Sequence, residues 1–328
     1  MRTRAAHRTG DRLHGGFGLI AFIFPGQGSQ AVGMGKALAD QFPICRETFE
    51  EADQSLGRSI SRLCFEGPAD ELTLTENTQP AILTVSVALA RLLSSRGFEP
   101  AWMAGHSLGE YSAHVAARTF AFSDAVRIVS RRGRYMQEAV PVGAGAMAAV
   151  LGLDAAKVAQ ACAEAADGEV VSPANMNAPG QVVIAGSRDA VARAGDRARQ
   201  LGAKRVVPLP VSAPFHCALM KPAEERLAPE LRALTAADPR VPVVANVDAE
   251  PKRDGRSAIE ALVGQVSLPV RWEEVVRRLG AEGVRTYVEL GPGSVLSGLV
   301  RKIDREATVL NVENPGGLAA VETLYRNA

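Results

Sequence analysis

The stretch Ala104-Gly105-His106-Ser107-Leu108-Gly109-Glu110-Tyr111 stands about a third of the way along the chain. An apolar run precedes it at 100–104, and a helix-like segment continues it at 111–117. The pattern predicts a strand, a sharp turn with a serine between two glycines, and a helix start, which is the G-x-S-x-G nucleophile elbow. Glycine avoids crowding in such a turn. The serine would stand above the sheet edge, where N–H groups at the helix start can hold an oxyanion. A chance match in an Ala- and Gly-rich chain is the alternative.

The composition is that of a globular protein. The chain has 328 residues, of which 47% are hydrophobic, and a mean hydropathy of +0.02. This length allows one large domain or two smaller ones with a sizeable core. A net charge of +1 gives no general attraction to nucleic acid or to an anionic membrane. Because the sequence has no apolar run of about eighteen residues, we expect no transmembrane helix.

The four cysteines, at positions 45, 64, 162 and 217, are scattered and form no C-x-x-C pair. This usage is typical of reduced thiols in a cytoplasmic protein. The five histidines do not cluster with cysteines, so we expect no metal site. Residues 1–18 are rich in arginine and lack the apolar centre of a signal peptide. We predict that they form a disordered N-terminal extension, with an over-extended start of the sequence as the alternative.

Alternating strand-like and helix-like segments predict an α/β fold with a largely parallel sheet. Before the elbow strand we expect a strand at 19–24 and helices at 43–56 and 80–96. Helices at 108–117 and 123–139 follow the elbow. The same pattern resumes after Pro214. We expect the following elements there: a helix at 218–235, strands at 241–247 and 286–290 with further helices between them, a helix from Ser294, a strand at 308–312 and a C-terminal helix.

The segment between these two stretches has a different texture. Strands at 147–153, around 172–177, at 181–185 and at 204–211 alternate with helices at 154–166 and 187–201. This βαββαβ order is the ferredoxin-like signature. We therefore predict a large α/β subdomain made of residues 19–142 and 213–328, with a small ferredoxin-like subdomain, residues 143–212, inserted into it.

A serine nucleophile needs a general base within hydrogen-bond reach. The other histidines fit this role poorly: His7 and His14 lie in the extension, His106 should point away from the serine on the elbow, and His114 looks like a packing residue two turns along the helix. His216 remains, in a loop between a strand and a helix. A surface-loop histidine is the alternative, but elimination together with the elbow favours His216 as the base.

The helix expected at 123–139 carries four arginines, three of which project to its wet face. Arg132 instead falls within the apolar arc at about 100° per residue. An unpaired guanidinium is costly to bury, so Arg132 needs an anionic partner. That partner is either an internal Asp or Glu or a substrate carboxylate, which arginine can hold with two hydrogen bonds. Periodicity does not choose between them.

Two glycine-rich turns complete the set of candidate site segments. Residues 24–30, Phe-Pro-Gly-Gln-Gly-Ser-Gln, loosely match the dinucleotide fingerprint. The expected acidic strand end is missing, because the segment about twenty residues on looks helical. Gln27 between its glycines fits better as an oxyanion-hole or positioning residue. Residues 289–294, Glu-Leu-Gly-Pro-Gly-Ser, either line the same edge of the sheet or form a plain tight turn.

Taken together, these segments resemble the malonyl-CoA:acyl-carrier-protein transacylase family over about residues 19–326. The resemblance rests on six motifs in the family's order: FPGQGSQ, GHSLGEYSA, the arginine helix, NxNxPGQ at 175–181, PFH at 214–216 and ELGPGSVL. It implies a hydrolase-like α/β core with a ferredoxin-like subdomain. It also implies a cytoplasmic enzyme, expected to be a monomer, that charges acyl carrier protein from malonyl-CoA for fatty acid synthesis without a cofactor.

The resemblance also implies roles for individual residues. Ser107 would be the nucleophile and His216 the base, without an acidic third member. Gln27 and the backbone N–H of Leu108 would form the oxyanion hole. Arg132 would hold the malonyl carboxylate. The remaining implied site residues are Gln265, which would orient the histidine through its backbone carbonyl, and Asn175, near the cleft between the subdomains.

The chain departs from the family at Phe215, where many members have serine. In related polyketide acyltransferases a phenylalanine here accompanies selection of malonyl over methylmalonyl groups, and its ring would crowd an α-methyl branch. Three rival functions stay open: a serine hydrolase on the same elbow, an acyltransferase of a polyketide pathway, and a non-catalytic scaffold that binds carrier protein.

Overall fold

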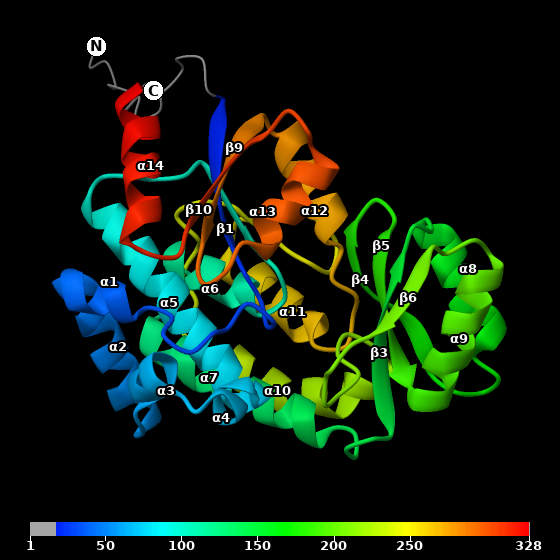
Figure 1. Ribbon diagram of the computed structural model, residues 1–328. Coiled ribbons are helices and arrows are strands. Elements are labelled where there is room, and N and C mark those ends of the chain that lie inside the picture. Colours follow the sequence, from blue (N-terminus) through cyan, green and yellow to red (C-terminus); the bar gives the residue numbers. More distant parts are fainter. Residues whose placement is uncertain (1–17, 328) are drawn as a thin grey trace, which may run out of the picture.

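The computed structural model describes residues 18–327 (Figure 1). Its strands are β1 (Leu19–Phe24), β2 (Trp102–Gly105), β3 (Gly145–Leu151), β4 (Val171–Ala178), β5 (Gln181–Ser187), β6 (Arg205–Pro208), β7 (Val243–Val244), β8 (Pro251–Lys252), β9 (Val284–Leu290) and β10 (Thr308–Val312). Its α-helices are α1 (Lys36–Gln41), α2 (Pro43–Leu56), α3 (Ile60–Glu66), α4 (Ala69–Thr73), α5 (Thr75–Ser95), α6 (Leu108–Ala116), α7 (Phe122–Glu138), α8 (Ala155–Ala165), α9 (Arg188–Gln200), α10 (Lys221–Arg232), α11 (Gly255–Gln265), α12 (Trp272–Ala281), α13 (Val295–Ile303) and α14 (Pro315–Asn327). A short 3-10 turn, Ala218–Met220, precedes α10.

The larger sheet has the order β10-β9-β1-β2-β7-β8 and is parallel except for β8. Alternate residues of β1 face opposite layers, as the two-residue period of a strand requires. Phe22 and Phe24 pack with the layer that contains α2, α5, α6 and α7. Ala21 and Ile23 pack with α12 and α13 on the other face. The expected α/β class with a mostly parallel sheet is confirmed.

The smaller sheet has the order β4-β5-β3-β6 and is antiparallel throughout. Helices α8 and α9 pack against it around a core of their own, so the β3-α8-β4-β5-α9-β6 order is that of a ferredoxin-like unit. Figure 1 shows it in green, beside the larger sheet. All its strands fall within the predicted 143–212 segment; the domain boundaries themselves stay a prediction.

Several expected elements are shorter or have shifted ends, and two of them differ most from the observed ones. The helix expected at 80–96 begins five residues earlier, at Thr75, with Pro80 inside it. Proline cannot donate to the carbonyl of Glu76, and that carbonyl instead accepts from Ser130 and Arg58. The strand expected at 241–247 is paired only at Val243–Val244, because the backbone N–H of Asn246 is bonded to a carboxylate instead.

Within residues 18–327, no helix combines the length and the apolar character needed to cross a membrane. The extension predicted for residues 1–18 lies outside the described residues, apart from Gly18.

Candidate active site

The elbow forms as the sequence predicts. Strand β2 ends at Gly105, α6 begins at Leu108, and Ser107 between them has φ 51° and ψ −109°. This is a strained conformation for a residue with a side chain. Both flanking glycines are required by space: a Cβ on Gly105 would lie 1.9 Å from the backbone carbon of Gly109, and one on Gly109 would lie 2.0 Å from the carbonyl oxygen of Phe24. The turn therefore lifts a half-buried Ser107 to the carboxyl edge of the parallel sheet.

His216 lies beside the serine. Its Nε2 is 2.7 Å from Ser107 Oγ, and its Nδ1 is 2.9 Å from the backbone carbonyl oxygen of Gln265. A carbonyl oxygen can only accept, so Nδ1 carries the proton and Nε2 is left to accept from the serine hydroxyl. Burial and the Arg132 guanidinium lower the pKa of His216 to about 3. The imidazole is therefore neutral at pH 7 and can take a proton.

Arg132 reaches the same point from α7. It is 1% exposed, whereas Arg127, Arg131 and Arg134 of the same helix are exposed, as the periodicity predicts. Its Nη2 donates to Ser107 Oγ at 3.1 Å and to the side-chain oxygen of Gln265 at 2.9 Å. Its Nη1 donates to Gln79 at 2.8 Å. All these acceptors are neutral, and Nε has no partner within residues 18–327. The internal Asp or Glu partner is not found: the guanidinium is held in place without a bonded anion.

A polar framework under the elbow fixes these groups. The side chain of Asn246 accepts from the N–H of Ser107 at 2.7 Å and donates to the carbonyl of Gly105 at 2.7 Å. The side-chain amide of Gln265 donates to the carbonyl of Ser107 at 3.0 Å and to Glu110 at 2.7 Å. Glu110 also accepts from the N–H of Asn246 at 2.9 Å. One carboxylate thus ties together the two residues that clamp the elbow and orient the histidine.

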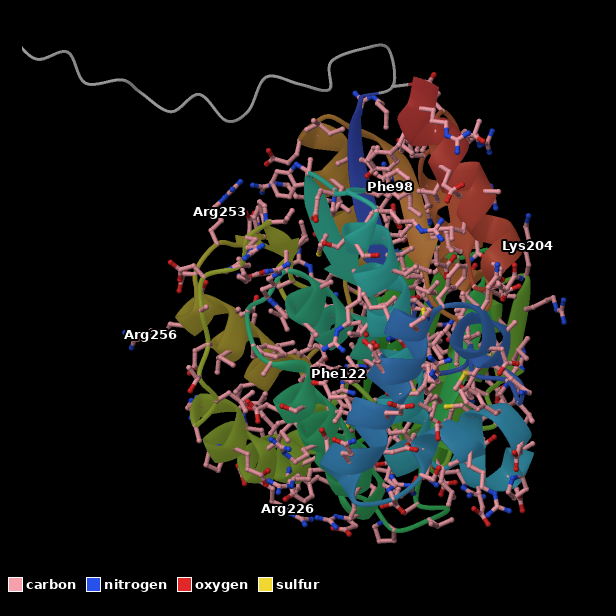
Figure 2. All side chains as sticks on the ribbon, turned by 90° about the vertical axis from the view of Figure 1, so that its left-hand side faces the viewer. Phe98, Phe122, Lys204, Arg226, Arg253 and Arg256 are labelled. Atoms are coloured by element: carbon pink, nitrogen blue, oxygen red, sulfur yellow. The ribbon has the colours of Figure 1, made fainter. Side chains whose placement is uncertain are left out.

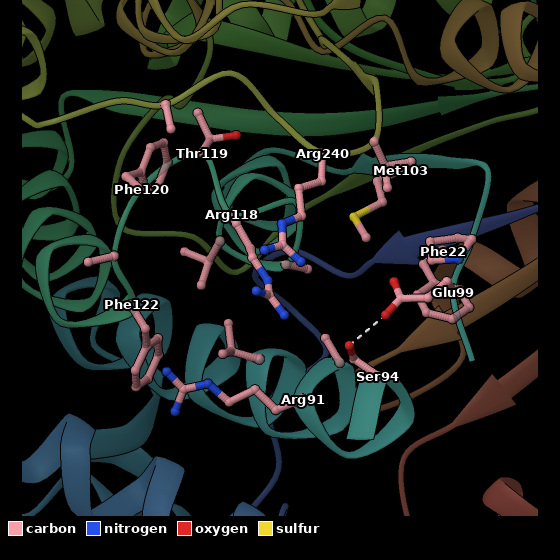
Figure 3. Close-up of a pocket in the computed structure, with 18 of the residues that line it drawn as sticks. Phe22, Arg91, Ser94, Glu99, Met103, Arg118, Thr119, Phe120, Phe122 and Arg240 are labelled. Carbon is pink, nitrogen blue, oxygen red and sulfur yellow. Dashed lines mark hydrogen bonds between the residues drawn. The ribbon is translucent and has the colours of Figure 1, made fainter. Parts of the chain in front are cut away.

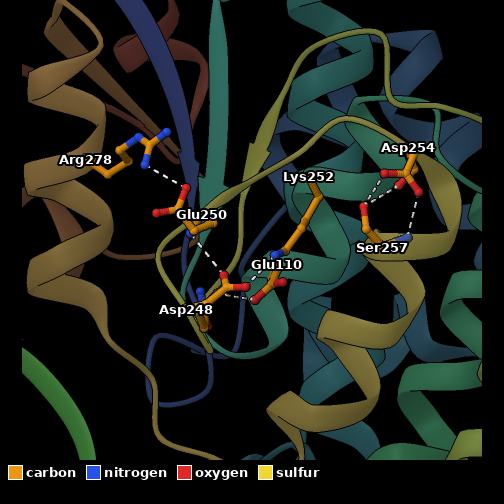
Figure 4. Close-up of polar contacts among 8 residues, drawn as sticks. Glu110, Asp248, Glu250, Lys252, Asp254, Ser257 and Arg278 are labelled. Carbon is orange, nitrogen blue, oxygen red and sulfur yellow. Dashed lines mark hydrogen bonds and ion pairs between the residues drawn. The ribbon is translucent and has the colours of Figure 1, made fainter.

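Glu110 is fully buried, and burial raises its pKa to about 7 despite these two hydrogen bonds. Figure 4 shows it beside the ion pair of Lys252 and Asp248. Glu110 does not occupy the third position of a Ser-His-Asp triad, because a backbone carbonyl occupies it.

The N–H groups at the start of α6 leave one free donor. Those of Ser107, Gly109 and Glu110 are bonded to Asn246, His106 and Ser107 respectively. The N–H of Leu108, the first residue of α6, has no partner in its own helix, so it is available to an oxyanion. Gln27 follows β1 on an exposed loop, and its side-chain amide donates to Thr75 at 3.3 Å.

The glycine-rich loop at 24–30 does not have the context of a dinucleotide-binding turn. In that motif a helix begins directly after the loop, whereas here the first helix, α1, begins only at Lys36.

The two glycine-rich turns meet at the elbow. A Cβ on Gly26 would lie 2.5 Å from the carbonyl oxygen of His106, and one on Gly291 would lie 2.5 Å from Pro25. The ELGPGS turn therefore packs against the FPGQGSQ loop, beside the elbow. Glu289 also holds the start of α13, because its carboxylate accepts from the N–H groups of Leu296 and Ser297.

Asn175 is buried on β4, where the smaller sheet joins the larger subdomain through an isolated bridge to Val270. Beside it, Asn177 bonds His106 Nε2 at 2.8 Å, so His106 points toward the smaller sheet and away from its neighbour Ser107. Phe215, which directly precedes His216, is buried in the main hydrophobic core. Neither Asn175 nor Phe215 takes part in the hydrogen bonds that join Ser107, His216, Arg132 and Gln265.

Sequence reasoning missed Gln79, Glu110 and Asn246. Each carried a weak signal: Gln79 directly precedes the helix expected at 80–96, Glu110 is a polar residue on an otherwise apolar face of the helix expected at 108–117, and Asn246 lies inside the strand expected at 241–247. Asn246 follows β7, the strand adjacent to β2, and the carboxyl ends of both strands lie at the same edge as the elbow. Asn246 lies beside Ser107 because β7 pairs with β2 in the sheet. The sequence alone does not tell which strands are neighbours.

Histidine, cysteine and carboxylate side chains form no metal-binding group of three or more within residues 18–327. The four cysteines are free and buried. Burial raises the pKa of the Cys45, Cys64 and Cys162 thiols to about 12 and that of Cys217 to about 11.

Comparison with known proteins identifies the family. The acyl transferase domain model matches residues 21–321. The malonyl CoA-acyl carrier protein transacylase of Escherichia coli K12 is 54% identical over 302 residues, which cover 92% of this chain and 98% of that protein. The acyl carrier protein S-malonyltransferase structure from Vibrio cholerae has a TM-score of 0.91 at 50% identity, covering 92% of this chain and 99% of that one. A type II polyketide synthase carrier protein in complex with its malonyl-transacylase gives a TM-score of 0.91 at 47% identity, covering 93% and 99%. The chain therefore belongs to the acyl transferase family and, within it, to the malonyl CoA-acyl carrier protein transacylases.

Proposed function

We propose that this chain transfers a malonyl group from malonyl-CoA to the phosphopantetheine thiol of acyl carrier protein, through an ester on Ser107, for fatty acid synthesis. The substrates in this proposal are those that the names of the related transacylases state. One related structure is a complex with a carrier protein. The observation that carries the proposal is the position of Arg132: a buried guanidinium 3.1 Å from Ser107 Oγ whose hydrogen bonds go to neutral oxygens.

This position fits a malonyl group for a geometric reason. In malonyl-CoA a single methylene separates the carboxylate from the thioester carbonyl. A carboxylate paired with Arg132 would therefore hold the carbonyl carbon close to Ser107 Oγ, and arginine can bind a carboxylate with two hydrogen bonds. The substrate anion would also replace the serine hydroxyl as an acceptor of Nη2, freeing Oγ to attack.

The acyl transfer would proceed in two balanced halves. Ser107 Oγ attacks the thioester carbon as its proton passes to His216 Nε2, and the oxyanion accepts from the N–H of Leu108 and the amide of Gln27. The C–S bond then breaks, and the CoA sulfur takes the proton from His216. In the second half the carrier-protein thiol gives its proton to His216 and attacks the malonyl ester. The proton returns to Ser107 Oγ when the C–O bond breaks.

Partial neutralisation of Arg132 by the malonyl carboxylate would help this chemistry. The guanidinium is one of the causes that lower the pKa of His216. A bound carboxylate reduces that effect, so the imidazole becomes a stronger base when substrate is present. Base strength near the working pH favours general base catalysis.

The test is the intact mass of the protein after brief exposure to malonyl-CoA, for the native chain and for Ser107→Ala. We expect a single malonyl adduct on the native chain, its absence in the variant, and its loss on addition of holo acyl carrier protein. Steady release of CoA into solution without carrier protein would instead identify a hydrolase. Absence of both adduct and CoA release with malonyl-, methylmalonyl- and acetyl-CoA would identify a scaffold.

A polyketide pathway is the second candidate, favoured by the related transacylase bound to a type II polyketide synthase carrier protein. The chemistry would be the same, so carrier preference separates the two. We expect faster discharge of the malonyl-enzyme by a fatty acid synthesis carrier protein. Faster discharge by the polyketide carrier would reverse the assignment.

The remaining expectations belong to the same proposal. We expect the enzyme to act as a monomer in the cytoplasm, without a cofactor, a membrane or a nucleic acid partner. The free, buried thiols support a reducing compartment. The serine-histidine-arginine set supports cofactor-free chemistry, because each proposed step uses groups of the protein and its substrates.

A further inference from the structure

A cavity of about 690 Å³ lies at the C-terminal ends of α5 and α6, away from the elbow (Figure 3). This volume is within the usual range of small-molecule sites. Its apolar lining comes from β1, β2, the end of α5 and the loop before α7, and includes Phe22, Met103, Phe98, Phe120 and Phe122. Figure 2 labels two of the lining residues, Phe98 and the buried Phe122.

The cavity is distinct from the candidate active site. Val115 and Ala116, at the end of α6, line it, whereas Ser107 directly precedes the first residue of that helix. At about 1.5 Å per residue, the nine residues of α6 separate the two places by about 13 Å. None of Ser107, His216 and Arg132 lines the cavity.

The charge of the cavity is unbalanced. Three arginines line it, at positions 91, 118 and 240, against a single acid, Glu99. Arg91 bonds Glu51 at 2.7 Å, and Glu99 accepts from Ser94 at 2.6 Å. Within residues 18–327 the side chains of Arg118 and Arg240 make no hydrogen bond or ion pair with the protein. Figure 3 shows both guanidinium groups extending into the middle of the cavity.

Two backbone hydrogen bonds bring these arginines together. Residues 237–240 are fastened to the loop after α6, because the N–H of Ala237 donates to Thr119 at 2.7 Å and that of Arg240 donates to Ala117 at 2.8 Å. Two like charges are thus held side by side over an apolar floor. Both side chains are exposed to solvent, and an anion placed between them would be attracted by both.

Arg118 also occupies a backbone position that suits glycine. Its φ is 62°, and the N–H of Thr119 after it donates to the carbonyl of His114 at 2.8 Å, which is the Schellman ending of a helix. Glycine is the usual residue at that left-handed position because a Cβ is strained there. The helix ending therefore gives no reason for an arginine at this position.

We propose that this cavity binds an anionic amphiphile, with a carboxylate or phosphate head between Arg118 and Arg240 and an acyl chain over Phe22, Met103 and Phe120. The unpaired guanidinium groups supply the charge complement, and the aromatic and methionine side chains supply the surface for the chain. This second site is independent of the acyl transfer at Ser107.

The test is isothermal titration calorimetry of the full chain with decanoate and decyl phosphate as probes. We expect one site per chain for the probes, and at least ten-fold weaker binding of 1-decanol and of inorganic phosphate, which each lack one half of the ligand. Arg240→Gln should weaken decanoate binding about ten-fold, the loss expected of one charge-assisted hydrogen bond. The exposed Arg256, which projects away from the cavity (Figure 2), gives the matched control Arg256→Gln, with no change.

Arg118→Gly separates binding from folding. It should weaken decanoate binding by a similar factor while leaving the melting temperature unchanged or raised, because glycine relieves the left-handed position. The Arg132→Ala variant should bind decanoate normally. Loss of decanoate binding in Arg132→Ala with retention in Arg118→Gly would assign the anion to the acyl-transfer site and overturn the proposal. An absence of measurable binding of either probe at millimolar concentration would overturn it too.

Discussion

Arg132 carries a positive charge although its side chain is almost fully buried, which is costly unless an anion pairs with it. It is a fully buried cation whose bonded partners are two amide oxygens and a hydroxyl, and burial lowers the pKa of its guanidinium. Arginine nevertheless stays protonated in proteins. A site that keeps a buried charge without a bonded counter-ion is prepared for an anionic substrate.

Replacing Arg132 by alanine should therefore separate malonyl from acetyl transfer. We expect malonyl transfer, measured as kcat/KM, to fall by roughly a hundred-fold, about 3 kcal/mol, because a charge-assisted pair is lost. Acetyl transfer, which makes no such pair, should fall less than about ten-fold. Equal losses with the two donors would remove Arg132 from carboxylate binding.

Glu110 should act as a positioning residue through Gln265 and Asn246. Glu110→Ala removes the acceptor of both, so we expect kcat to fall roughly ten- to a hundred-fold with KM for malonyl-CoA nearly unchanged. Glu110→Gln keeps an oxygen at that place and should retain most activity. Because the pKa of Glu110 is about 7, any dependence of kcat on its ionisation near pH 7 should disappear in the glutamine variant. A parallel loss in both variants would instead indicate a need for the charge.

At the scale of elements, the junction of β2 and α6 depends on close backbone approach. Gly105 and Gly109 face each other and β1 at distances that leave no room for a methyl group. This crowding presses α6 against the sheet and aims its first N–H groups at the serine. The strain at Ser107 is maintained by Asn246, which holds the turn from both sides.

Gly105→Ala should therefore unfold or destabilise the protein by about 3 kcal/mol or more, since the new Cβ overlaps backbone that cannot move freely. The control is Gly298→Ala in α13, where a Cβ meets nothing within 4 Å. It should stabilise the helix by about 0.5–1 kcal/mol. Urea unfolding of both variants gives the comparison, and a stable Gly105→Ala protein would show that the elbow can relax.

At the scale of the whole molecule, the buried His114 and His216 and the half-buried His106 are kept neutral. Burial lowers the pKa of His106, and it lowers those of His114 and His216 to about 3. The unfolded chain, with a histidine pKa near 6.5, binds more protons than the folded chain between pH 3 and 6.5, so stability falls as the pH drops through that window. Glu110, whose pKa burial raises to about 7, acts in the opposite direction between pH 4.5 and 7.

His114 isolates this effect because it lies outside the acyl-transfer site. In His114→Asn the free energy of unfolding should depend less steeply on pH below 6.5, by about 1.4 kcal/mol per pH unit. Chemical unfolding of the native chain and the variant at several pH values measures the difference. Identical slopes would show that His114 takes up its proton equally in the folded and the unfolded chain.

The sequence by itself determined the elbow, most of the strand and helix order, the ferredoxin-like insertion and the burial of Arg132, because these follow from local periodicity and from steric rules at glycine. It also reduced the candidate bases to His216. Tertiary structure alone decided that the acceptors of Arg132 are the amides of Gln79 and Gln265, that Asn246 and Glu110 hold the elbow, and that Arg118 and Arg240 share a cavity. Those contacts join residues of distant segments, and the order of strands in the sheet, which no local pattern states, brings them to one edge.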